Sequence, residues 1–277
     1  MTATVDAITL DIIQSALVNA RNEMDSVLKH ISLSPVIREQ NDAFPMICNE
    51  RGQMVVGQFG SYIPGVVEQY EDNIHEGDIF VWNDPYACKG SISHNNDWCV
   101  MMPIFHDGTL VGYSSMFGHM IDVGGKVAGS MPFDARSIWE EGLRIPPVKV
   151  YEQGKLNEGV LAIMLNNSRT PDSNRSDLMA LIAGCRVAAT RVQELCDRFG
   201  RGVYLAACDH LLVRTHTAMK ALIEKYIPHE PVSFTDYVDD DGRGNGPFRM
   251  QLAIYRKGEK AVFDWTGTAE QAEGPIN

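Results

Sequence analysis

A short polar turn joins two apolar runs near the middle of the 277-residue chain. Residues 98–105 and 109–117 are mostly apolar, and His106, Asp107 and Gly108 lie between them. Asp-Gly is the strongest short-range signal for a β-hairpin, because a type I′ turn requires a positive φ at both central residues. The sequence therefore predicts an antiparallel hairpin with Asp107 and Gly108 at its tip.

This hairpin brings together two histidines that are 25 residues apart in the sequence. When the strands pair outward from the turn without interruption, His119 lies opposite Asn96. His119 is then close to both His94 and Asp97, because directly opposed Cβ atoms are about 4.5 to 5.5 Å apart. Two imidazoles and one carboxylate are thus predicted to converge at the open end of the hairpin.

Such a set of side chains has the chemistry of a metal site. Imidazole nitrogen and carboxylate oxygen together suit Zn²⁺, Mn²⁺ or Fe²⁺, and a closed structural zinc site is disfavoured because the predicted set contains no thiolate ligand. Two histidines and one carboxylate leave positions open for water or substrate, as in catalytic sites. The alternative is that His94 and His119 are polar residues at strand ends, with the neighbouring aspartates capping loops.

Two further aspartates are candidates for the same site. Asp42 directly precedes a β-type run that begins at Ala43, where it is placed to supply a fourth ligand. Asp122 follows His119 by three residues and is the candidate catalytic residue acting on the ligands. A carboxylate that accepts the free N–H of a metal-bound histidine fixes its tautomer. Capping of a helix or turn explains Asp122 equally well.

Hydrophobic periodicity predicts an α+β fold. Apolar residues recur at helical spacing in two regions, and short β-type runs punctuated by Gly, Asn, Asp and Pro occupy the others. The predicted elements are an amphipathic helix at 6–31, a β-rich region at 44–155, a helical block at 175–226 that divides at Gly200, and a hairpin formed by 248–255 and 260–265. A β-rich metal-binding region is thus flanked by an N-terminal helix and a helical block.

These regions suggest three domains. Residues 1–155 hold the N-terminal helix and the β-rich metal-site region, residues 156–228 form the helical block, and residues 229–277 begin a further β region. The last residues follow a strand-like run without a capping or polar tail. We therefore expect the C-terminal β segment to be truncated and to continue in a longer chain.

Charge and cysteine content exclude several classes of protein. The formal charge is −12, and no basic run is present that would neutralise nucleic-acid phosphates. No window approaches the roughly 18 consecutive apolar residues that cross a bilayer, and the N-terminus does not have the pattern of a signal peptide. The six cysteines are scattered without a C-x-x-C motif, as expected of reduced thiols. The sequence predicts a cytoplasmic protein that binds neither nucleic acid nor membrane.

Several of these residues form a pattern that resembles the hydantoinase B family. The pattern comprises His94-x-x-Asp97, His119, the Gly-Ser-Met segment at 129–131, and the closing segments 263–268 and 274–277. The family includes the large subunits of acetone and acetophenone carboxylases and parts of oxoprolinases, and the similarity extends along essentially the whole chain. Hydantoinase-type members usually have Thr-His-x-Pro-Asp where this chain has Ser-His-Asn-Asn-Asp, which keeps the ligands and leaves the substrate branch open.

The resemblance implies a ligand set and a partner. In the carboxylase branch, the His-x-x-Asp pair, the later histidine and an upstream acidic residue hold manganese or zinc. This implies His94, Asp97, His119 and Asp42 as ligands here, with Glu39 as the alternative acidic residue. Such enzymes are heteromers in which a hydantoinase A-like subunit binds ATP and activates the substrate by phosphorylation. The sequence agrees, because its Gly-Gly-Lys segment at 124–126 lacks the other residues of a phosphate-binding loop.

The leading expectation is the metal-bearing subunit of an ATP-dependent ketone carboxylase. The metal would stabilise an enolate or an activated carbonyl as a Lewis acid, and bicarbonate would be the second substrate. The segment from Pro103 to Asp122 looks closer to this branch. The first alternative is ATP-dependent hydrolysis of a cyclic amide such as hydantoin, 5-oxoproline or a lactam. The second is a non-catalytic scaffold subunit with a structural ion.

Overall fold

A computed structural model describes residues 5–40, 42–90 and 92–276 of the chain. It divides into two compact units, the first formed by residues 1–131 and 141–211 and the second by residues 132–140 and 212–277. Helix α6 (Arg201–Tyr226) begins in the first unit and ends in the second. The fold class is α+β, as the sequence predicts.

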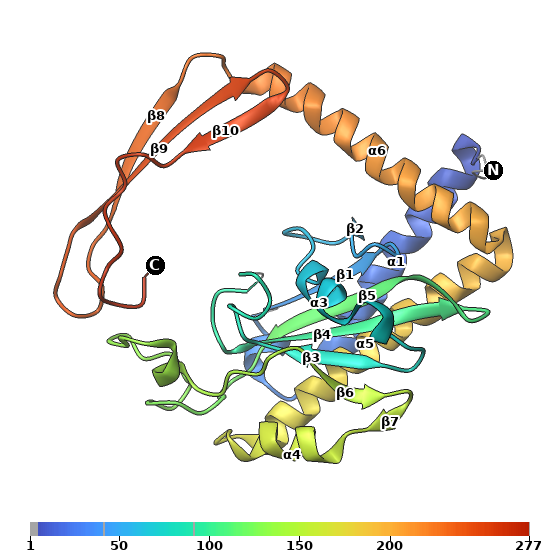
Figure 1. The fold of residues 1–277 in the computed structure, drawn as a ribbon, viewed down its shortest axis with the longest axis horizontal. Coiled ribbons are helices and arrows are strands. Elements are labelled where there is room, and N and C mark those ends of the chain that lie inside the picture. The colour runs from blue at the N-terminus through green and yellow to red at the C-terminus, as the bar shows by residue number, and fades with distance from the viewer. Residues whose placement is uncertain (1–4, 41, 91, 277) are drawn as a thin grey trace. The chain divides into compact units, whose positions relative to one another are not determined.

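The first unit is built around one antiparallel sheet (Figure 1). Among the described residues, seven strands have the order β2-β1-β5-β4-β3-β6-β7, so the β4–β5 hairpin lies in the middle of the sheet. The helices and strands, in chain order before α6, are α1 (Ala7–Ile31), α2 (Pro35–Arg38), β1 (Ala43–Cys48), β2 (Met54–Val56), α3 (Pro64–Tyr70), the 3₁₀ helix η1 (Glu71–Asn73), β3 (Ile79–Trp82), β4 (Asp97–His106), β5 (Thr109–His119), β6 (Val148–Glu152), β7 (Lys155–Leu156), α4 (Glu158–Asn166) and α5 (Pro171–Phe199).

The predicted turn is confirmed. Asp107 and Gly108 have φ values of 50° and 68°, and His106 pairs with Thr109 on either side of them. Both central residues therefore have the positive φ that a type I′ turn requires. The tip of the hairpin follows directly from its two-residue sequence.

The predicted register of this hairpin is wrong by one residue at its open end. The strands pair as expected next to the turn, but the register shifts between Ile104 and Phe105, where Val111 is the extra residue of a β-bulge. Because the bulge moves one strand along the other, His119 is opposite Asp97 and not Asn96. The shift places the histidine and the aspartate directly across from each other.

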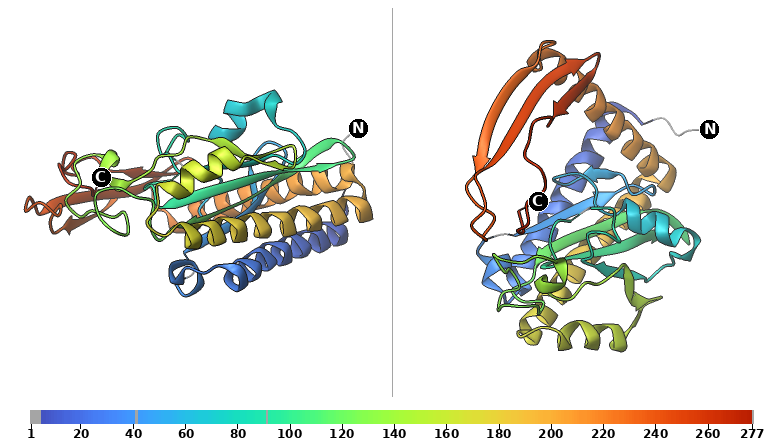
Figure 2. Two further views of the ribbon diagram at one scale, coloured as in Figure 1. Left: turned by 90° about the horizontal axis from the view of Figure 1, so that it is seen from below. Right: turned by 60° about the vertical axis from the view of Figure 1, so that its left-hand side comes forward.

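Two hydrophobic clusters cover the two faces of the sheet. Helices α1 and α5 lie on one face and α3 on the other (Figure 2, left). Successive side chains of β4 point to opposite faces of the sheet. Trp98 and Val100 belong to the cluster with α1 and α5, whereas Cys99 and Met101 belong to the cluster with α3. We call the second side the α3 face. The central strands are therefore buried on both sides.

The N-terminal helix and the division of the helical block are both confirmed. Asp6 caps α1 by accepting hydrogen bonds from the first-turn amides, and the helix buries a stripe that includes Leu17 and Met24. Gly200, with a φ of 85°, separates α5 from α6. Helix α5 begins at Pro171, four residues before the predicted start, and the sequence analysis missed α4.

Gly112 is required by the close approach of β5 to β1. A Cβ atom at this position would lie 2.4 Å from the carbonyl oxygen of Cys48. We expect Gly112→Ala to lower the free energy of unfolding by about 1 to 3 kcal/mol, because the backbone of β1 must move. Urea denaturation measures the change, with Gly159→Ala as the control. A Cβ at the helical, exposed Gly159 has its nearest neighbour at 3.5 Å, so this variant should be neutral or slightly stabilising.

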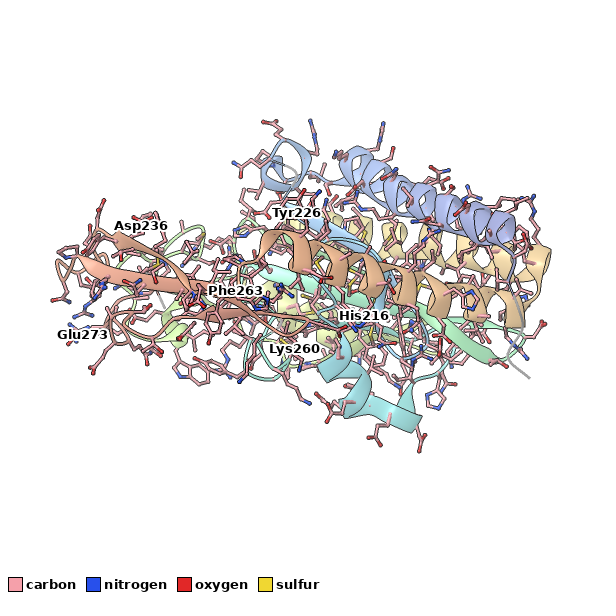
Figure 3. The ribbon with its side chains drawn as sticks, turned by 90° about the horizontal axis from the view of Figure 1, so that it is seen from above. His216, Tyr226, Asp236, Lys260, Phe263 and Glu273 are labelled. Carbon is pink, nitrogen blue, oxygen red and sulfur yellow. The ribbon has the colours of Figure 1, made fainter. Side chains whose placement is uncertain are left out.

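The second unit contains a smaller antiparallel sheet. Its described elements, besides the end of α6, are the 3₁₀ helix η2 (Ile138–Glu141, whose last residue belongs to the first unit), β8 (Val232–Val238), β9 (Phe248–Lys257) and β10 (Lys260–Asp264), with the strand order β10-β9-β8. The predicted hairpin is present, because Lys260 pairs with Lys257. Tyr226 at the end of α6 and Phe263 on β10, both labelled in Figure 3, are exposed.

Two further findings concern the chain as a whole. All six cysteines lie in the described part and are buried free thiols, as expected. No described helix combines the length and the apolar character needed to cross a membrane.

Candidate metal centre

Three of the predicted ligands meet at the open end of the β4–β5 hairpin. Asp97 is the first residue of β4 and His119 is the last residue of β5, and the two are directly opposed. His94 lies in the loop before β4, and its carbonyl oxygen accepts a hydrogen bond from the Asp97 amide at 3.4 Å. This turn brings the His94 imidazole back over the strand ends. The structure therefore brings together residues from two strands and one loop.

The three side chains aim one atom each at a common centre. His94 Nε2 is 3.2 Å from His119 Nδ1 and 3.3 Å from Asp97 Oδ1, and His119 Nδ1 is 3.2 Å from Asp97 Oδ1. Asp97 Oδ1 is buried and has no hydrogen bond of good geometry, although both imidazoles are near it. A buried carboxylate oxygen without a hydrogen bond, facing two ring nitrogens, can be satisfied by a cation or by a shared proton between them.

These distances fit a divalent metal ion. Ligand atoms bonded at about 2.0 to 2.2 Å to a tetrahedral ion are about 3.3 to 3.6 Å apart, and they are somewhat closer around an octahedral ion. The observed separations of 3.2 to 3.3 Å match the arrangement in which all three atoms bind one ion. Asp97 is 7% exposed and His94 is partly exposed, so an ion bound between them would be reachable from the His94 side.

The charges in the site support one another. Burial acts to raise the pKa of Asp97, but the interactions with His119 and His94 outweigh it, so the pKa of this carboxyl lies below its ordinary value. The nearby Asp97 carboxylate raises the pKa of His94 despite partial burial. Asp97 is thus held as the anion that a metal ion requires.

Ser93 orients the His94 ring. Its Oγ lies 2.9 Å from His94 Nδ1, the ring nitrogen that faces away from the centre. When this nitrogen donates its proton to Ser93, Nε2 carries the lone pair that a metal ion needs. That tautomer is the ligand form of the imidazole. The sequence analysis missed this role, although Ser93 is next to the motif.

Asp42 lies at the edge of the centre. Its Oδ2 is 3.7 Å from His119 Nδ1, its side chain is 41% exposed, and its carbonyl oxygen accepts a hydrogen bond from the His119 amide. This position, at the start of β1, is the one the sequence predicts for the fourth ligand. Glu39, the alternative, is the exposed residue that caps the C-terminal end of α2.

Asn96 connects the two halves of the motif and was not identified from the sequence. It is 1% exposed, and its Nδ2 donates to the carbonyl oxygens of Met120 and Gly129 at 2.9 and 3.2 Å. Its own carbonyl oxygen accepts from the Met120 amide at 2.8 Å. These bonds hold the loop of His94 and Asp97 against the segment that follows His119.

Asp122 has a different set of partners from the one expected. Its Oδ1 accepts the amides of Gly124 and Arg169, and its Oδ2 accepts the Gly129 amide and Arg169 Nη1, all at 2.9 to 3.0 Å. The expectation that it accepts an N–H from a ligand histidine is therefore not met, because four other donors occupy both oxygens. Burial acts to raise the pKa of Asp122, but the amides of Arg169, Gly129 and Gly124 outweigh it and lower the pKa. Asp122 organises the loop that follows His119.

The partner of Asp122 could not be found from local sequence. Arg169 is 47 residues away, and its guanidinium also donates to the carbonyl oxygens of Gly124, Gly125 and Val127. One arginine side chain thus binds three carbonyl oxygens of the loop that follows His119.

Curated proteins with similar sequences include subunits of two characterised enzymes. The beta subunit of caprolactamase from Pseudomonas jessenii is 34% identical over 267 residues, which cover 93% of this chain and 45% of that protein. The delta subunit of acetophenone carboxylase from Aromatoleum aromaticum is 29% identical over 249 residues, which cover 85% of this chain and 36% of that protein. The chain spans less than half the length of these relatives.

A solved structure and a family profile agree with these similarities. The crystal structure of ATP-dependent caprolactamase from Pseudomonas jessenii matches with a TM-score of 0.85 and 33% identity, over 94% of this chain and 46% of that one. Residues 6–277 match the profile described as Hydantoinase B/oxoprolinase, which is the family that the sequence pattern resembles. The match includes every residue of the centre, and the chain belongs to the hydantoinase B/oxoprolinase family.

Proposed function

We propose that this chain is the metal-bearing part of an ATP-dependent enzyme that hydrolyses a cyclic amide. The observation that carries the proposal is the triangle of His94 Nε2, His119 Nδ1 and Asp97 Oδ1, with sides of 3.2 to 3.3 Å, at the open end of the hairpin. A divalent ion held there, manganese or zinc, would supply Lewis acidity to a substrate carbonyl. Asp42 is the proposed fourth ligand.

The protein's own groups have distinct tasks in this reaction. His94 and His119 bind as neutral imidazoles, and Asp97 supplies the negative charge that keeps a cation in place. Asn96 and Asp122 hold the loops on either side of the centre, so the ligand atoms keep their separations when substrate binds. In this proposal a hydantoinase A-like partner subunit binds ATP and activates the amide by phosphorylation, which is supported by the similar proteins being the beta subunit of caprolactamase and the delta subunit of acetophenone carboxylase.

The similarity values favour the hydrolysis of a cyclic amide over ketone carboxylation. The caprolactamase subunit is 34% identical over 93% of this chain, whereas the acetophenone carboxylase subunit is 29% identical over 85% of it. The sequence pattern alone favoured the carboxylase. The second candidate is therefore carboxylation of a ketone, which the acetophenone carboxylase similarity supports. Both reactions stabilise negative charge on a carbonyl oxygen, so both fit the same centre.

Turnover by the reconstituted complex separates the two reactions. The chain and its ATP-binding partner are incubated with ATP and either ε-caprolactam or 5-oxoproline, and in parallel with acetophenone and labelled bicarbonate. We expect ATP-dependent ring opening that does not change when bicarbonate is removed. Label in an acid-stable product without ring opening would establish the carboxylase and reject the hydrolase.

A further inference from the structure

The face of the sheet that carries the metal centre also carries a row of aromatic residues. His119 and Asp97 point to the α3 face, and the residues two positions along each strand, Phe117 and Cys99, point to the same face. Phe44 pairs with Phe117, and Trp82 pairs with Cys99. Asp97 and His119 form one row across the sheet, which we call the ligand row. Phe44, Phe117, Cys99 and Trp82 form the next row across four strands, which we call the aromatic row, about 7 Å away.

The two phenylalanines of this row are held firmly in place. The rings of Phe44 and Phe117 are 4.9 Å apart, and Tyr62 meets Phe117 edge-on at 5.3 Å. Tyr62 is 5% exposed, and its hydroxyl donates to the Phe44 carbonyl oxygen at 3.0 Å. Phe44 and Phe117 themselves are only half-buried. A rigid aromatic surface thus stays partly open beside the centre.

Phe59 extends this surface outward from the loop between β2 and α3. Its ring meets Phe44 edge-on at 4.6 Å with an interplanar angle of 85°, and the residue is 82% exposed. Its φ is 61°, which is unfavourable for a bulky side chain. The loop approaches β1 so closely that a Cβ at Gly57 would lie 2.7 Å from Met46 Cβ. A strained, exposed aromatic residue gains little from burial, which indicates a role in binding.

We propose that Phe44, Phe59 and Phe117 form an apolar subsite that receives the hydrocarbon part of the carbonyl substrate. This inference rests on the proposed function. The carbonyl oxygen of the substrate would lie at the metal ligands, and the ring attached to it would lie on the neighbouring aromatic row. The three rings offer no partner to a carboxylate. The subsite therefore favours an uncharged, apolar lactam or aryl ketone over 5-oxoproline, which carries a charged group next to its ring.

Two hydroxamates test the subsite through binding alone. Acetohydroxamate and benzohydroxamate present the same metal-chelating group and differ in the ring. The full chain is loaded with Zn²⁺ and titrated with each by calorimetry. We expect the wild type to bind benzohydroxamate at least about 10-fold more tightly, because the phenyl ring is taken out of water onto the aromatic row. Phe59→Ala should reduce this preference roughly 3- to 10-fold and leave acetohydroxamate binding unchanged.

Exposure makes Phe59→Ala a safe variant for folding, and Phe234→Ala is the matched control. Phe234 is an exposed phenylalanine of β8, 66% exposed, and its removal should leave the preference unchanged. Equal affinities for the two hydroxamates in a chain that binds Zn²⁺ would overturn the subsite and leave the proposed function standing. A chain that does not bind Zn²⁺ overturns both, and the preceding Zn²⁺ titration identifies that case.

Discussion

His119→Ala should lower the affinity for Mn²⁺ or Zn²⁺ by at least about 100-fold and abolish turnover, while the chain stays folded. The substitution removes one of the three atoms that converge within 4.8 Å, and even loss of a group that only orients a ligand costs 10- to 100-fold in metal affinity. Folding should change little, because the His119 side chain contacts His94 and Asp97 and belongs to neither hydrophobic cluster. Calorimetric titration with each metal measures the affinity, and thermal denaturation measures the stability.

His106→Ala is the matched control for this experiment. His106 lies at the other end of the same hairpin, and its Nε2 pairs with Asp197 at 2.9 Å, so it is also a histidine with an aspartate partner. This variant should bind metal as the wild type does. If His119→Ala kept its metal and activity, the ligand assignment would be wrong. If it caused the complex with the partner subunit to fall apart, the scaffold alternative with a structural ion would be favoured.

Asp122→Asn should lower the free energy of unfolding by about 2 to 4 kcal/mol at neutral pH. Four N–H donors point at the two carboxylate oxygens, and an amide offers one oxygen and one NH₂ group in their place. The NH₂ group faces either the amides of Gly124 and Arg169, or the Gly129 amide and Arg169 Nη1. A backbone amide left without an acceptor costs about 1 to 3 kcal/mol, and Arg169 loses its anionic partner in either case. Asp122 is 3% exposed, so water does not replace the lost partners. Urea denaturation of both proteins measures the difference.

The difference in the free energy of unfolding between wild type and Asp122→Asn should become smaller as the pH falls. The folded-state pKa of Asp122 is lowered from 3.8, so the carboxylate stabilises the fold fully above that value and loses its contribution as the pH falls through the lowered pKa. The gap between wild type and Asp122→Asn should therefore close on acidification. Asp172→Asn, at an exposed position in the first turn of α5, should show a gap of about 1 kcal/mol or less. A gap at Asp122 that is small at pH 7 or grows at low pH would contradict the assigned role.

The sequence predicts what depends on local chemistry. Asp107 and Gly108 specify their turn because few residue pairs accept two positive φ angles, and Gly200 divides the helical block for the same reason. The β-bulge at Val111 was missed, although Gly112 beside it was a usable signal. An isolated glycine inside a strand indicates a bulge or a close approach of another backbone, and here it marks both.

In the candidate site too, the residues positioned by local structure were predicted, and those positioned by distant segments were not. His94, Asp97 and His119 were found because one hairpin positions them, and a shift of one residue did not separate them. The partner of Asp122 and the position of Phe59 depend on chain segments far away in the sequence. Such contacts are decided by the packing of the whole unit, which residue spacing within a segment does not report.

Anomalous X-ray diffraction from crystals grown with Zn²⁺, recorded above and below the zinc absorption edge, tests the metal centre most directly. We predict a single strong peak about 2.0 to 2.2 Å from His94 Nε2, His119 Nδ1 and an oxygen of Asp97. A peak bound elsewhere on the chain, or no peak in a preparation that is active with its partner, would contradict the proposal that these three side chains hold the metal ion.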